Sequence, residues 1–104
     1  MARFIGSKTP LNAAGVWSEV LQAGREDWIS GVVFSDVAGS LQIEQGVDGV
    51  NWDYDTAPIA VAAGVGSAFK EEIYAPYIKL TYTNGGAGQA VFRIGARFSS
   101  AGNR

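Results

Sequence analysis

The feature that most constrains the fold is an alternating segment, residues 39–46, that runs directly into a tight turn. A period of two is typical of a β-strand with one buried and one solvated face. The Asp48-Gly49 pair that follows accepts the positive φ of a tight turn, and Trp52 beyond it can fold back over the end of a sheet. The stretch therefore predicts a half-buried strand. Its core side carries Leu41, Ile43 and Gln45, and its outer side carries Gln42 and Glu44.

The rest of the chain repeats this pattern of short strands divided by turn residues. The chain has 14 glycines, which favour turns, and no segment shows a helical period. Strands spaced about 8–12 residues apart are typical of two packed sheets. The sequence therefore predicts an all-β fold, an antiparallel β-sandwich of jelly-roll type with about eight strands. The predicted strands are residues 15–23, 28–37, 39–46, 50–54, 59–62, 68–74, 77–83 and 89–99.

Two pairs of predicted strands are joined by short turns, which favours hairpins. The first pair, 15–23 and 28–37, flanks a turn that contains glycine and charged residues. The second pair, 77–83 and 89–99, flanks a turn with three glycines. In this second hairpin the predicted core face carries Ile78, Leu80, Tyr82, Phe92, Ile94, Ala96 and Phe98, and the opposite face carries Lys79, Thr81, Arg93 and Arg97.

Chain length and apolar content bound the domain organisation. A chain of 104 residues is long enough to bury one core, and with no cysteine it has no disulfide framework. We expect residues 1–14 to form an N-terminal arm or a loose first strand, residues 15–100 a single sandwich domain, and residues 101–104 a flexible tail. The N-terminus lacks the apolar core of a signal peptide, and the most apolar stretch, 57–69, is too short to span a membrane. We therefore predict no export signal and no membrane partner.

The composition excludes most catalytic chemistry. Histidine and cysteine are both absent, which removes the commonest general base, the thiolate nucleophile and the usual soft metal ligands. The net charge of −2 gives no basic footprint for nucleic acid. We therefore predict that the protein is not an enzyme, and that it has no catalytic residues, no cofactor and no nucleic-acid partner.

The acidic turn after residue 46 is a candidate metal site. Asp48, Asn51, Asp53 and Asp55 offer oxygen atoms to a hard cation such as calcium. Their spacing lacks the register of a calcium-binding loop, and Asp-Gly and Asp-x-Asp sequences are ordinary turn chemistry. We predict a turn here and no metal.

Two short phrases of the sequence resemble small β-sandwich virion proteins of tailed bacteriophages. Residues 43–52, Ile-Glu-Gln-Gly-Val-Asp-Gly-Val-Asn-Trp, resemble their S-x-D-G-x-x-W turn, with Gly46 where serine is usual. Residues 77–94 resemble their Y-I/V-R/K-x-x-Y-x-N-G hairpin. The turn is also similar to that of discoidin-like, galactose-binding sandwiches. The likeness spans about residues 16–98 and implies a sandwich fold and a virion role.

The phage resemblance implies a decoration or head-auxiliary protein that binds the outer surface of a capsid and reinforces it. Its implied partners are the major capsid protein and further copies of itself, with a homotrimer favoured. Its implied location is the exterior of the virion capsid, after synthesis in the host cytoplasm without a signal peptide. Aromatic anchors dominate such contact surfaces. The predicted capsid or subunit interface consists of Arg3, Phe4 and Ile5 in the arm, together with Trp17 and Trp28.

The aromatic residues also keep a second function open. Trp52 and Tyr54 would offer stacking faces to a sugar ring, and Asp53 between them would accept its hydroxyl groups. The chain would then be a carbohydrate-binding module, or a fibre or adhesin domain that recognises a glycan. This alternative requires Trp52 to lie on a concave, solvent-facing surface.

Overall fold

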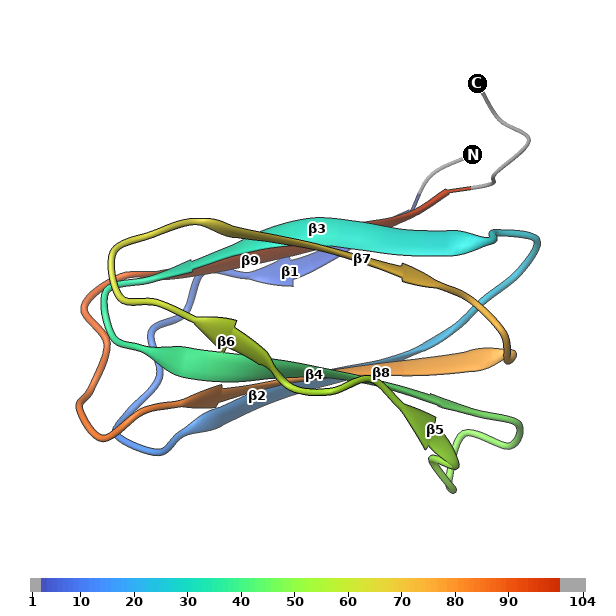
Figure 1. The fold of residues 1–104 in the computed structure, drawn as a ribbon, viewed down its shortest axis with the longest axis horizontal. Helices are drawn as coiled ribbons and strands as arrows, with labels where there is room; N and C mark the ends of the chain where they lie inside the picture. Colours follow the sequence, from blue (N-terminus) through green and yellow to red (C-terminus); the bar gives the residue numbers. More distant parts are fainter. Residues whose placement is uncertain (1–2, 100–104) are drawn as a thin grey trace.

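The computed structural model describes residues 3–99, and for Arg3 and Phe4 it describes the backbone alone. These residues form two stacked antiparallel sheets (Figure 1), which confirms the predicted all-β sandwich. The described residues contain no helix, and so no helix that could cross a membrane. The predicted tail, 101–104, lies outside the described residues. The nine strands within residues 3–99 are β1 (Arg3–Ser7), β2 (Val16–Gln22), β3 (Trp28–Ser35), β4 (Gly39–Gly46), β5 (Tyr54–Asp55), β6 (Ile59–Val61), β7 (Ser67–Glu72), β8 (Tyr77–Asn84) and β9 (Phe92–Ser99).

The chain winds back and forth between the two sheets. One sheet, named the β3 sheet, has the strand order β1-β9-β3-β7. The other, named the β4 sheet, has the order β2-β8-β4-β5, and β6 also pairs with β4. From β1 to β4, and again from β7 to β9, each strand lies in the opposite sheet to the strand before it. This winding is that of a jelly roll, as predicted.

Both predicted hairpins are wrong, because the strands of each pair belong to different sheets. β2 pairs with β8, whereas β3 pairs with β9 and β7. β8 lies between β2 and β4, and the chain then crosses to the other sheet to form β9. A glycine-rich turn indicates that the chain reverses. It does not distinguish a hairpin within one sheet from an arch between two sheets.

The predicted core side of β8 and β9 is confirmed, although the two strands meet across the sandwich. Alternate residues of both strands are buried, and the ring centroids of Tyr82 and Phe92 lie 4.9 Å apart. The other residues of each strand alternate with the buried ones and point to the outer surface of their own sheet, so those of β8 and β9 lie on opposite faces of the sandwich. Lys79 lies on the outside of the β4 sheet, whereas Arg93 and Arg97 lie on the outside of the β3 sheet. The prediction that these cations share one face is therefore wrong.

The hydrophobic core is the layer of alternating side chains between the sheets. Full burial of one aliphatic or aromatic side chain contributes about 1.5–3 kcal/mol to stability. Because the alternation gives every second side chain to the core, the residues left over determine each outer surface. The buried core consists of Ile29, Val33, Leu41, Ile43, Val61, Phe69, Ile78, Leu80, Tyr82, Phe92, Ile94, Ala96 and Phe98.

The N-terminal segment is bonded to the body of the sandwich over its described part. β1 pairs along its whole length with β9. Beyond β1, the Gln89 backbone N–H donates to the Leu11 carbonyl at 2.9 Å, and the Gln89 side chain accepts the Leu11 N–H at 2.7 Å. The Asn84 side chain donates to the Asn12 carbonyl at 2.8 Å. These bonds hold β1 in place as the outer strand of the β3 sheet.

The predicted strand 50–54 is wrong over most of its length, since only the short β5 forms at its end. The Asp48 carboxylate accepts the backbone N–H groups of Val50 and Asn51 at 2.9 and 2.8 Å. These donors are committed to the turn and cannot join a sheet ladder. The positive φ predicted for the turn is confirmed, at 78° for Gly49.

Replacement Gly49→Val should lower the free energy of unfolding by about 1–3 kcal/mol, because a β-branched residue is strained at this φ. A Cβ at this position would also lie 3.2 Å from the Tyr77 ring. Gly88→Val is the matched control, since its added side chain meets open space and its φ lies outside the left-handed region. Thermal melts should show a lower melting temperature for Gly49→Val than for the control. Equal melting temperatures would contradict the strain.

Candidate association surface

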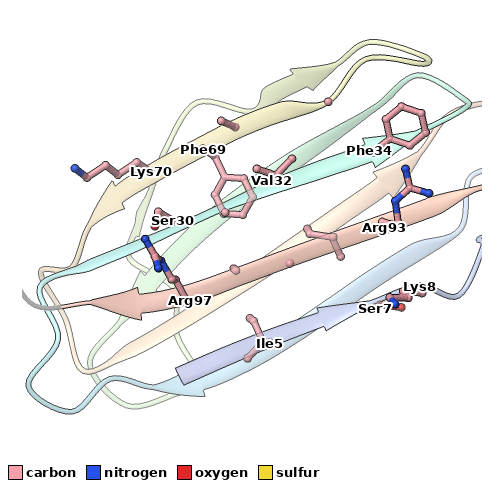
Figure 2. A pocket seen from close by; sticks show the side chains of 16 residues that line it. Ile5, Ser7, Lys8, Ser30, Val32, Phe34, Phe69, Lys70, Arg93 and Arg97 are labelled. Carbon is pink, nitrogen blue, oxygen red and sulfur yellow. The ribbon is translucent and has the colours of Figure 1, made fainter. Parts of the chain in front are cut away.

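The outer face of the β3 sheet carries an open groove of about 1100 Å³ (Figure 2). Its lining residues come from all four strands of this sheet and from the residues next to β1 and β7. None of the lining residues belongs to the β4 sheet. The groove is therefore a surface feature and not a space between the two layers.

The cross-strand register explains why the sheet is hollowed at this point. Gly6 of β1 lies opposite Gly95 of β9. Gly95 lies opposite Val32 of β3, and Val32 lies opposite Ala68 of β7. These residues, which have short side chains or none, form one row across the sheet. A Cβ on Gly95 would meet only open space. The neighbouring rows carry longer side chains and form the walls: Arg97, Ser30 and Lys70 on one side, and Arg93 and Phe34 on the other.

The floor of the groove is apolar. Val32 is 54% exposed, and Figure 2 shows it near the middle of the groove, with Phe34 further along β3. Phe69 of β7 also lines the groove, although it is only 6% exposed and belongs to the core. A Cβ on Gly31 would lie 2.8 Å from the end of the Phe69 ring. Exposed apolar patches on a folded domain are typical of contact surfaces.

The rim of the groove is basic. Of the six Lys and Arg side chains that the structure describes, four line it, whereas none of the ten Asp and Glu residues does. The Lys70 ammonium lies 4.5 Å from the Trp28 ring centroid, and the Arg93 guanidinium lies 4.7 Å from that of Phe34. No rim cation forms an ion pair with a described residue, so all four remain free to meet carboxylates of a partner. The rim cations are Lys8, Lys70, Arg93 and Arg97.

The structure places four of the five predicted interface residues in the β3 sheet and separates the fifth. Ile5 lines the groove, and the backbones of Arg3 and Phe4 belong to the same edge strand, β1. Trp28 begins β3 and contacts a rim cation. Trp17 lies on β2, at the edge of the other sheet, where it is half-buried against the core. Trp17 therefore does not belong to this surface.

Val32, Phe34 and Lys70 were not predicted as members of one site. Val32 and Phe34 lie on the same strand, β3, but Lys70 lies on β7, and local patterns do not report register between strands distant in the sequence. The available signal was glycine inside predicted strands, at Gly31 and Gly95. Such glycines mark a gap in the side-chain layer or a close approach of another group.

The three residues of the glycan alternative do not form one surface. Trp52 covers Gly46, where a Cβ would lie 3.2 Å from the indole ring. Tyr54 pairs with Gln45 in the β4–β5 register, is 48% exposed and meets Tyr74 edge-on, with 5.5 Å between the ring centroids. Asp53 is exposed, and none of the three lines the groove. This geometry does not present Trp52 and Tyr54 together to one sugar.

The acidic turn, residues 47–53, is named the β4–β5 loop. Hydrogen bonds from the backbone N–H groups of Asn51 and Val50 lower the pKa of the Asp48 carboxyl. This carboxylate is satisfied within the turn, and residues 3–99 contain no cluster of acidic side chains suited to a metal ion. The tip of the loop exposes Val47 and Val50, at 69% and 76%.

The winding of the strands places the protein in the class of jelly-roll sandwich domains. Within that class, the chain belongs to the family of the N-terminal domain of the uncharacterised protein YqxG, whose model matches residues 2–99. No curated protein matches the chain.

Several solved structures share the fold. The PBSX exported protein XepA has a TM-score of 0.86 and 24% identity; the match covers 100% of this chain but only 38% of XepA. The Yersinia pseudotuberculosis-derived mitogen has a TM-score of 0.67 and 10% identity, covering 100% of this chain and 91% of that chain. A disulfide-linked pilus of Bacillus endospore appendages has a TM-score of 0.57 and 17% identity, covering 97% and 88% of the two chains. At these identities the likeness shows a common fold.

The variant Asp48→Ala should destabilise the protein in a pH-dependent way. Because the folded state lowers the pKa of Asp48, this carboxylate stabilises the fold above the ordinary aspartate pKa, and the contribution is lost as pH falls through the lowered value. The melting-temperature gap to the wild type should be largest above about pH 5 and shrink below about pH 3.

Glu19→Ala is the control, since the Glu19 side chain is exposed on β2 and makes no hydrogen bond to a described residue. The melting-temperature difference between Glu19→Ala and the wild type should not show this dependence on pH. An Asp48→Ala gap that is equally large at both ends of the pH range would refute the role of the charged carboxylate.

Proposed function

We propose that this chain is a non-enzymatic structural protein of a phage-associated particle and that it works by surface association through the groove of the β3 sheet. The observation that carries the proposal is the groove itself. Its exposed apolar floor is edged by four cations that have no ion-pair partner among the described residues. Such a sheet face supplies affinity by burying apolar area and pairing charges, without reactive groups.

The polar groups of the groove favour binding over catalysis. Its charged lining residues are all cations, and its hydroxyl groups are those of Ser7 and Ser30. A serine nucleophile requires a neighbouring base. The lining contains neither a carboxylate nor a histidine to supply one.

The similarity to XepA supports the phage association. XepA is an exported protein of PBSX and is phage-related, and its fold matches this chain over the whole length of the chain. The turn and the 77–94 phrase resemble those of virion proteins, which points in the same direction. Because the chain spans only 38% of XepA, the proposal concerns the role of this one domain and not that of a whole protein like XepA.

In its most specific form, the proposal places the chain on the exterior of a phage capsid, bound to the major capsid protein as a homotrimer. A stable contact buries about 800 Å² on each partner. Attachment of several linked copies at once raises the overall affinity without new contacts at each site. An oligomer therefore suits a repetitive shell.

Cosedimentation with mature, expanded phage shells from the source of the protein tests this function. The wild type should bind saturably, at a fixed ratio to the shell subunit. Val32→Asp should weaken binding at least about tenfold, because it puts a charge on the apolar floor of the groove. Val20→Asp is the matched control, since Val20 is 49% exposed against 54% for Val32 and lies on the outside of the other sheet.

Absence of wild-type binding would refute the capsid form of the proposal. Equal binding by the Val32→Asp and Val20→Asp variants would remove the groove from the association.

A further inference from the structure

The groove sets chemical requirements for its occupant. The occupant must present apolar side chains to Val32 and Phe34 and carboxylates to the basic rim. The chain carries such a projection itself, in the β4–β5 loop. Val47 and Val50 at its tip are the most exposed of the large hydrophobic side chains among the described residues. The exposed carboxylates in and beside the loop are those of Asp48, Asp53 and Asp55.

The loop and the groove of one molecule lie on different sheets and face different directions. Figure 1 shows β5 and the turn before it projecting from the β4 sheet, away from the β3 sheet. The groove opens on the outer face of the β3 sheet. A contact between loop and groove therefore requires two copies of the chain.

The loop is ordered before it meets a partner. The Asp48 carboxylate accepts three hydrogen bonds within the loop, from the backbone of Val50 and from the backbone and side chain of Asn51. These bonds hold the two valines in one arrangement. A segment that is already ordered loses less conformational entropy on binding than a flexible one.

We propose that the groove of one copy binds the β4–β5 loop of a second copy. Val47 and Val50 of the loop cover the apolar floor around Val32, and Asp53 and the neighbouring carboxylate of β5 meet the cations of the rim. The inference rests on the proposed function in one respect, that the groove is an association surface. It names the partner of that surface as another copy of this chain, so Val32→Asp would weaken shell binding by removing the linked copies that attach together.

The contact joins two different surfaces, so it is heterologous. Each copy that uses its groove still presents a free loop, and repetition of the contact gives a closed ring or an open chain of copies. A symmetric dimer would need one patch that contains both the loop and the groove, and the two lie on different sheets. A ring leaves no loop or groove unused.

Sedimentation velocity on the purified protein, without shells, tests the contact. The wild type should form an oligomer of three or more copies, and 1 M salt should weaken it because salt screens the rim charges. Val32→Asp in the groove and Val50→Asp in the loop should each sediment as monomers. Val20→Asp should assemble as the wild type does. Circular dichroism melts establish that each variant is folded.

A mixing experiment is the decisive step. Val32→Asp retains an intact loop, and Val50→Asp retains an intact groove, so an equimolar mixture of the two should form a one-to-one dimer and nothing larger. If Val32→Asp does not fold, the rim variant Arg93→Glu replaces it in the same mixture.

Three outcomes would overturn the inference: a wild type that stays monomeric, a folded Val50→Asp that assembles as the wild type does, or a mixture that remains monomeric. A monomeric wild type that still binds shells through the groove would refute this inference and leave the proposed function intact. An oligomer that assembles as described but binds no shell would refute the capsid form and leave the loop–groove contact intact.

Discussion

Burial of alternate side chains between the two sheets is the constraint on which the rest of the structure depends. β3 gives Ile29 and Val33 to the core and so turns Val32 and Phe34 outward. Because β3 and β9 are the inner strands of their sheet, their outward residues occupy the middle of its outer face. The groove is thus a consequence of how the core is filled. The glycine at position 95 deepens it by leaving the outer side of β9 without a side chain.

The same alternation also places a polar side chain, the amide of Gln45, on the core side of a strand. Gln45 follows Leu41 and Ile43 in the alternation and is buried, as the sequence predicts. Its side chain accepts the backbone N–H groups of Tyr74 and Ala75, at 2.7 and 3.1 Å, and also donates to a backbone carbonyl of β7. Burial of a polar group without such partners would be costly. Gln45 therefore attaches the connection between β7 and β8 to β4, in the sheet opposite to that of β7.

Local patterns in the sequence predicted the strands and their core sides, but not the strand partners. The period of two placed Leu41 and Ile43 in the core, and the Asp-Gly pair predicted the positive φ at Gly49. Both hairpins were wrong because turn residues report a reversal of the chain and carry no information on which sheet receives the next strand. The groove was missed for a related reason. Its floor and rim come from strands that are distant in the sequence and are aligned only by the register of the folded sheet.

The central claim is that the outer face of the β3 sheet is the surface through which the protein associates. The chain has three lysines: Lys8 and Lys70 lie on the rim of the groove, and Lys79 lies on the outside of the other sheet. Lysine acetylation of the free and the assembled protein, followed by mass spectrometry, compares the three within one sample. The account predicts that assembly protects Lys8 and Lys70 while Lys79 stays reactive. Protection of Lys79 with Lys8 and Lys70 as reactive as in the free protein would contradict it.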